Sequence, residues 1–317
     1  GRISMVELLY AVLPVFLLVL LGSVCRLASA RCATWEHGLN QFGLYVAFPA
    51  LIIHSLLKVR GNFSLDGGIY LLNTAILVLL IVIPWVVTRA LKTETKLANT
   101  WIICIFFGNI GYLGFPIITR MLSGDPHLGA GMIETSLALH ISLYNIVLFS
   151  LGLFILEHSK GSHGGSLRIL RSVGTNPLLL SVVAGVALAV FDIPLPKAVE
   201  DVIALLSNSA TAVVLFGLGL FLPDVRFERK TLGHVIALTT ISLIAVPVFF
   251  LGVYAVFNPG REFLVSILEG AMPLAVSPFV LGASYPLDRP IIAGSILVST
   301  ALSVVTIPVI LKLAQGL

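Results

Sequence analysis

The stretches FGNIGYLGFPI at residues 107–117 and EGAMPLAVSPF at residues 269–279 decide the fold of this chain. Each lies inside an apolar run that is long enough to cross a membrane, and glycine or proline interrupts both. In a helix interior glycine costs about 1 kcal/mol and proline about 3 kcal/mol relative to alanine, so neither stretch favours a continuous helix. An interrupted helix is tolerated at membrane depth only where protein or a watery cavity satisfies the freed backbone groups. We therefore predict two broken membrane helices.

The composition places the remaining chain in a membrane as well. Of 317 residues, 58% are hydrophobic and 11% are charged, whereas about 25% of residues are charged in a soluble domain. The mean hydropathy of +1.06 agrees with this, and the composition excludes a soluble enzyme. The three cysteines, Cys25, Cys32 and Cys104, have no metal-ligand spacing and imply no disulfide framework. We expect no metal, no cofactor and no nucleic-acid partner.

Apolar runs of about 20 residues are needed to cross the hydrocarbon core as a helix. The sequence contains ten of them, which predicts an all-α polytopic membrane protein. The predicted transmembrane helices are 6–25, 38–57, 68–91, 97–121, 130–156, 176–193, 199–222, 233–257, 262–285 and 290–314.

The distribution of basic residues predicts the orientation. The loops after the odd-numbered helices hold 12 of the 19 lysine and arginine residues. Because such loops favour the cytoplasmic side, we expect both termini on the extracytoplasmic side.

The two broken helices occupy corresponding places in the two halves of the chain. They are the fourth and the ninth of the ten predicted helices, and a polar connector at 158–175 separates repeats at 1–157 and 176–317. Because each repeat has an odd number of helices, the second enters the membrane from the opposite side. We therefore predict inverted repeats whose helices 4 and 9 cross near the midplane. The alternative is ten helices with scattered kink prolines, since other predicted helices also contain proline: Pro14, Pro49, Pro84, Pro247 and Pro308.

Five stretches resemble the auxin efflux carrier (PIN-like) family, which is related to the bile-acid sodium symporter group. They occur in the family's order and cover essentially the whole chain. The stretches are PALIIHSLL at 49–57, GNIGYLGFP at 108–116, NPLLLSVVAGVALAVFDIPLP at 176–196, LSNSATAVVLFGLGLFL at 206–222 and GAMPLAVSPFVLGASYPLD at 270–288.

The resemblance implies a secondary transporter that exports a small organic anion, auxin-like or a dicarboxylate. It also implies a scaffold and a mobile transport domain, each drawn from both repeats, that work by an elevator motion. A homodimer through the scaffold helices is a further implication. Because the connector is short, the chain resembles bacterial or short-loop members, for which we expect the inner membrane.

Around the first break we expect substrate contacts from Asn109, Gly108 and Ile110, and a helix break at Gly111, Gly114 and Pro116. Asn109 falls where the family has its crossover asparagine, and the resemblance implies that it contacts the substrate. An amide can donate to a carboxylate without bringing a formal charge into the membrane. The alternative is that Asn109 caps a half-helix.

Around the second break we expect substrate contacts from Ala271, Met272 and Pro273, with Pro278 as a further break residue. The N-terminus of a half-helix presents free N–H groups and a partial positive charge, which suits a carboxylate. The substrate site therefore needs no lysine or arginine at the midplane.

Glu269 is the sharpest single candidate, because an ionisable group inside a membrane is costly and points to function. It could exchange a proton during transport, or it could reach an aqueous cavity or a neighbouring hydroxyl. Four further residues are candidates for coupling or for lining a cavity: His54, His140, Tyr144 and Asn208. For His54 and His140 the alternative is a structural role, in which a neutral histidine is hydrogen-bonded between helices.

The favoured function is alternating access with the substrate at the crossing of helices 4 and 9. The partners are then a small organic anion and membrane lipid. A proton- or sodium-coupled organic acid symporter is the alternative, as is a channel or sensor on the same fold. A membrane enzyme is disfavoured, because the sequence shows no nucleophile or metal-ligand motif.

Overall fold

A computed structural model describes residues 5–58, 67–106, 108–122, 140, 143–144, 147, 151–159, 177–224 and 229–315. In these residues all regular structure is helical, apart from one isolated bridge between two single residues. The uninterrupted helices are α1 (Met5–Ala28), α4 (Gly67–Ala90), α10 (Pro177–Val190), α11 (Lys197–Phe221) and α16 (Arg289–Gln315).

Five stretches of the described chain are long and apolar enough to span a membrane. They are Arg31–Leu57, Gly68–Ala90, Lys197–Asp224, Arg229–Phe257 and Arg289–Gln315. An all-helical membrane protein is thereby confirmed, whereas the count of ten helices stays a prediction. The predicted run 130–156 lies largely outside the described residues, and so does the connector 158–175.

In the described part of the chain, three complete π turns are each followed by a proline at the same distance. The turns are η2 (Gly43–Ala47), η3 (Ile110–Gly114) and η6 (Ile241–Ala245). They lead into α3 (Phe48–Leu57), α6 (Phe115–Leu122) and α13 (Val246–Phe257), whose second residues are Pro49, Pro116 and Pro247. A proline ring clashes with the carbonyl four residues earlier, and a π turn relieves that clash by widening the helix.

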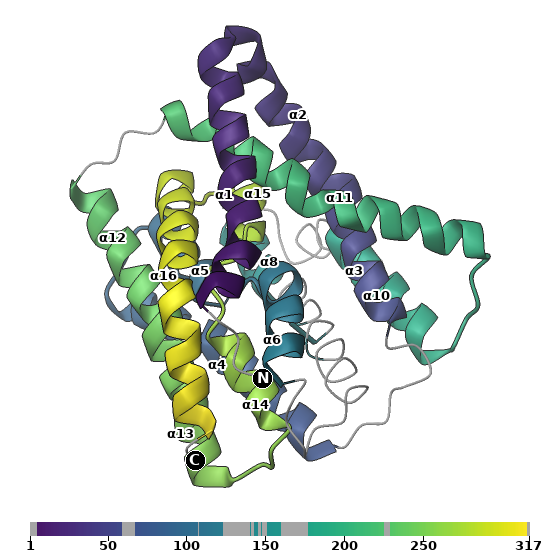
Figure 1. The fold of residues 1–317 in the computed structure, drawn as a ribbon, viewed down its shortest axis with the longest axis vertical. Helices are drawn as coiled ribbons and strands as arrows, with labels where there is room; N and C mark the ends of the chain where they lie inside the picture. The colour runs from purple at the N-terminus through teal and green to yellow at the C-terminus, as the bar shows by residue number, and fades with distance from the viewer. Residues whose placement is uncertain are drawn as a thin grey trace.

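The helices pack as two groups, and each group takes helices from both halves of the chain (Figure 1). The α11 group consists of α1, α2 (Trp35–Phe42), α3, α10 and α11. The α16 group consists of α4, α5 (Thr95–Phe106), α6, α8 (Leu153–Ser159), α12 (Arg229–Thr240), α13, α14 (Phe263–Gly270), α15 (Ser277–Leu281) and α16. Contacts of α1 with α16 and of α15 with α11 join the two groups.

In the α11 group, helices α1 and α11 approach closely at two glycines. A Cβ atom added to Gly219 would lie 2.2 Å from the Val19 carbonyl oxygen and 2.9 Å from the Gly22 Cα. The Ser23 hydroxyl donates across the same contact to the Gly219 carbonyl at 2.9 Å. Small residues allow this backbone approach, which is how membrane helices associate without a hydrophobic driving force.

Candidate functional site

The first helix break is narrower than the sequence predicts. Helix α5 ends at Phe106, Asn109 is non-helical, and helical structure resumes at Ile110. Gly111 and Gly114 therefore lie inside the η3 turn, and Pro116 is the second residue of α6. The π turn absorbs these helix-breaking residues, so the described non-helical backbone of this segment is confined to 108–109.

The second break is longer. Helix α14 ends at Gly270 and α15 begins at Ser277, so residues 271–276 lie between two short helices. Pro278 is placed in the first turn of α15, where a missing N–H costs nothing, rather than in the break itself. Residues 269–276 are all buried.

The two breaks meet each other through their backbones. Gly108 and Leu274 form an isolated antiparallel bridge, and the Asn109 N–H donates to the Pro273 carbonyl at 2.7 Å. These backbone groups have no partner within their own helices, so each break satisfies part of the other. The contact brings together residues 108–110 and 271–273, which are the predicted substrate contacts of the two halves.

The two segments pack tightly at the glycines. A Cβ atom on Gly108 would lie 3.3 Å from the Glu269 carbonyl oxygen, and one on Gly114 would lie 3.2 Å from Met272 Cγ. Met272 thus packs against the first segment from the second, and Ile110 and Asn109 are buried beside it. Among the described residues, the side-chain amide of Asn109 has no hydrogen-bond partner.

A serine on α16, which is not among the predicted site residues, also contributes to the site. The Leu274 N–H donates to the Ser299 hydroxyl on α16 at 3.1 Å. Ser295, Ser299 and Ser303 recur every four residues and are fully buried. Polar residues on one face of an otherwise apolar spanning helix mark the side that faces other protein, and this spacing could have revealed the contact.

Glu269 is the second-last residue of α14, directly before the second break, and is 1% exposed. Its Oε2 atom lies 2.9 Å from His140 Nδ1, and His140 Nε2 lies 3.4 Å from Asn73 Nδ2 on α4. The edge of the Tyr70 ring also meets the His140 ring, at 5.8 Å between centroids. Glu269 Oε1 is buried and has no hydrogen-bond partner among the described residues. The structure thus joins two predicted candidates in a buried polar chain.

Of the remaining candidates, Tyr144 lies beside the first break, whereas His54 and Asn208 lie elsewhere. The Tyr144 ring packs on Phe106, the last residue of α5, at 5.5 Å between centroids. His54, half-buried on α3, and Asn208, exposed on α11, both belong to the α11 group rather than to the α16 group, which contains the breaks. In the part of the chain that the structure describes, no three His, Cys, Asp or Glu side chains gather to hold a metal ion.

Spanning helices and two interrupted segments joined by backbone hydrogen bonds define a polytopic membrane protein whose candidate site is built from helix ends. The family model for "Membrane transport protein" matches residues 8–164 and 166–311. The chain therefore belongs to this family, the auxin efflux carrier family.

Curated relatives cover nearly the whole chain. An "Uncharacterized transporter" of Methanothermobacter thermautotrophicus is 27% identical over 94% of this chain and 95% of its own length. A "Putative malonate transporter" of Rhizobium meliloti is 26% identical over 98% of this chain and 97% of its own length. An "Uncharacterized transporter" of Methanocaldococcus jannaschii is 24% identical over 93% of this chain and 95% of its own length. The family and these names indicate a transporter.

Proposed function

We propose that the protein is a secondary transporter that carries a small organic anion and binds it where the two helix breaks meet. The observation that carries this proposal is the pairing of Asn109 N–H with Pro273 C=O beside an Asn109 side chain that has no partner among the described residues. A buried amide beside helix ends is suited to a ligand that accepts hydrogen bonds.

The electrostatics of the breaks favour a negative charge. Helical structure begins directly after Asn109, so the N–H groups of residues 110–112 have no carbonyl partner earlier in their own helix. These N–H groups and the helix dipole supply partial positive charge without a lysine or arginine. A carboxylate suits this environment, and the name of the Rhizobium meliloti relative suggests malonate as the first substrate to test.

The two helix groups suggest how access alternates. Each draws on both halves of the chain, which supports inverted repeats with helices 4 and 9 crossing. We propose an elevator motion in which the α16 group carries the site along the α11 group. The orientation is the one that the basic loops predict, with both termini outside the cell. An exported anion would then gain about 2.3 kcal/mol per charge per 100 mV of membrane potential.

The buried pair of Glu269 and His140 favours proton coupling as an addition to this carrier. Glu269 lies on α14 between its His140 partner and the break, and its backbone carbonyl faces the position of Gly108. A proton shared by this pair could be released or taken up as the substrate comes and goes. Glutamate and substrate would repel each other if both were ionised, so protonation would accompany loading.

The test is uptake of radiolabelled malonate into proteoliposomes with and without an imposed potential. We expect saturable flux that responds to the potential and falls at least tenfold in Asn109→Leu. The matched control is Thr240→Leu, which makes a similar polar-to-apolar change at an exposed position of α12 and should preserve flux. Both variants must elute as folded protein in size-exclusion chromatography.

The other outcomes are distinct. Flux that does not saturate would favour a channel. Conversion of malonate into a new product would establish an enzyme. Saturable flux that persists in Asn109→Leu would keep the transporter but move the substrate away from the breaks.

A further inference from the structure

A second cavity lies between α4, α5 and α8, and none of its described lining residues belongs to either helix break. Its volume is about 610 Å³, which is ample for part of a lipid molecule. The described lining residues that matter here are Ile81, Trp85, Arg89, Asn99, Phe154 and His158.

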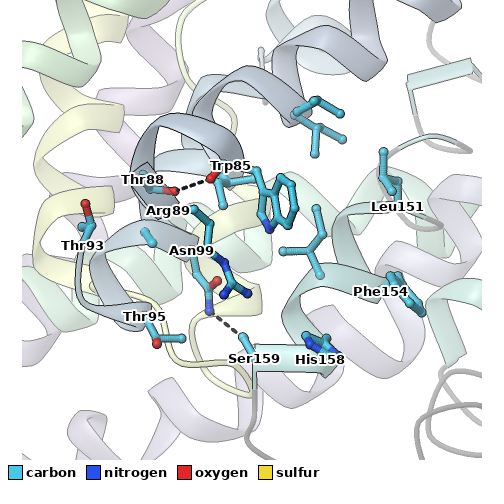
Figure 2. A pocket seen from close by; sticks show the side chains of 15 residues that line it. Trp85, Thr88, Arg89, Thr93, Thr95, Asn99, Leu151, Phe154, His158 and Ser159 are labelled. Atoms are coloured by element: carbon cyan, nitrogen blue, oxygen red, sulfur yellow. Dashed lines mark hydrogen bonds between the residues drawn. The ribbon is translucent and has the colours of Figure 1, made fainter. Parts of the chain in front are cut away.

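The cavity is polar at one end and apolar at the other. Helix α4 lines it from Ile81 to Arg89, a distance of about 12 Å at 1.5 Å per residue. Its polar end is formed by Arg89, Asn99 and His158, and its apolar end by residues such as Ile81 and Ile102. Figure 2 shows the Trp85 ring in the middle, with Arg89 and Asn99 to one side and Leu151 and Phe154 to the other.

The polar end carries positive charge without an acidic counterpart. The Arg89 guanidinium lies over the Trp85 ring, 5.7 Å from its centroid, and no carboxylate of the described residues pairs with it. No Asp or Glu occurs among the described lining residues. The Asn99 amide donates to the Ser159 hydroxyl at 2.7 Å, and that hydroxyl donates to the Leu156 carbonyl at 2.7 Å, so this end of the cavity is already ordered. Such an end attracts an anion.

The cavity opens where a membrane surface is expected. Arg89 lies one residue before the end of the apolar helix α4, and tryptophan followed by arginine is typical of the interface between lipid and water. Trp85 is 40% exposed and Phe154 is 49% exposed, so apolar groups flank the cavity on the outside of the protein. An acyl chain could therefore enter from the side while a charged headgroup stays at the rim.

We propose that this cavity binds an anionic phospholipid, with the phosphate headgroup at Arg89 and an acyl chain between Trp85 and Phe154. A basic pocket between membrane helices on the cytoplasmic side is suited to anionic headgroups. A free organic anion would use the charge of Arg89 but not the apolar end, which extends about 12 Å beyond it. The combination of both ends favours the lipid.

The test is photolabelling of the intact protein in nanodiscs with photoreactive phosphatidylglycerol or photoreactive phosphatidylcholine. We expect phosphatidylglycerol to label peptides from 81–102 or 151–159 more strongly than phosphatidylcholine. Arg89→Gln should lower the phosphatidylglycerol labelling about fivefold, the ratio for ~1 kcal/mol per basic residue near a membrane surface. Ala98→Phe should lower labelling by both lipids, because it fills the cavity and leaves the charge in place.

The matched control is Arg229→Gln, which removes an exposed arginine at the start of α12 and lies outside the described lining. It should leave the labelling unchanged. Equal labelling by the two lipids, or no effect of Arg89→Gln, would overturn the proposal. Displacement of the phosphatidylglycerol label by malonate would also overturn it, because the cavity would then belong to the transported anion.

Discussion

At the scale of single residues, the contact between His140 and Glu269 is the most consequential. Both side chains are almost fully buried, and the 2.9 Å contact links α14 to a residue far away in the sequence. Removing one partner of such a pair leaves the other buried without its hydrogen bond, which costs more than removing both. The pair therefore ties the second break to the helices around it.

We predict that His140→Ala lowers the free energy of unfolding by about 1–3 kcal/mol, because Glu269 loses its partner. Glu269→Ala should be similarly costly, and the double variant should be more stable than the sum of the two changes predicts. Thermal unfolding of the purified variants in detergent measures this. Strictly additive losses would show that the two side chains do not interact.

Glu269 and His140 are both identifiable as candidates from the sequence, but their pairing is not. Glu269 stands out in the sequence because an ionisable group is costly at membrane depth. Which helix supplies that partner depends on how the helices rotate against each other, and a single sequence does not specify that. The hydrogen bond of Ser299 to the second break is not predictable from Ser299 alone, because a single serine in an apolar helix is equally consistent with helix packing.

At the scale of helices, the close approach of α1 and α11 predicts that a side chain at the contact destabilises the protein. Gly219→Ala should lower the free energy of unfolding by about 1–3 kcal/mol, because its Cβ would lie 2.2 Å from the backbone oxygen of Val19. A backbone atom cannot give way as a flexible side chain can, so the two helices must separate.

Gly217→Ala is the matched control on the same helix. Its added Cβ would lie no closer than 3.8 Å to its nearest neighbour, which is an ordinary contact. Thermal unfolding in detergent should therefore show little change for this variant. Helix propensity favours alanine over glycine at both positions, so a loss as large as that of Gly219→Ala would show that the α1–α11 contact does not set the cost.

Hydropathy and the positions of glycine and proline predict the helices better than they predict the contacts between them. Hydropathy located the spanning helices that the structure describes, and glycine and proline located both interruptions. The extent of the first break was overestimated, because Gly111, Gly114 and Pro116 fit into a π turn and the start of α6. The pairing of Gly108 with Leu274 could not be predicted, since it depends on the distant register of two segments.

At the scale of the whole molecule, Arg289 connects the two helix groups. It is the first residue of α16, and its guanidinium pairs with Glu36 on α2 of the α11 group. It also lies 4.3 Å from the ring centroid of Phe221 on α11 and 4.2 Å from that of Phe279 on α15. The sequence does not indicate this contact, because Glu36 and Phe221 come from the other group. Relative motion of the groups must break the contacts of Arg289 with Glu36 and Phe221.

We predict that Glu36→Gln raises hydrogen–deuterium exchange about tenfold in residues 29–40 and 282–292 together. A hydrogen bond to a charged group contributes about 1.5–3 kcal/mol, and 1.4 kcal/mol corresponds to tenfold. Asp201→Asn is the control, because the exposed Asp201 pairs at 3.0 Å with Lys197, which lies on the same helix, α11. This pair does not join the two groups. If residues 282–292 exchange at the wild-type rate in Glu36→Gln, Arg289 does not hold the groups together.

The backbone hydrogen bond between the two helix breaks, here called the joint, determines which experiments can test it. The donor is the main-chain N–H of Asn109 and the acceptor is the main-chain carbonyl of Pro273. Every amino acid has this carbonyl, and every amino acid except proline has this N–H. Ordinary mutagenesis can reshape the surroundings of this joint but cannot delete the acceptor. Only an ester in place of the peptide bond before Asn109 would remove the donor and leave every side chain intact.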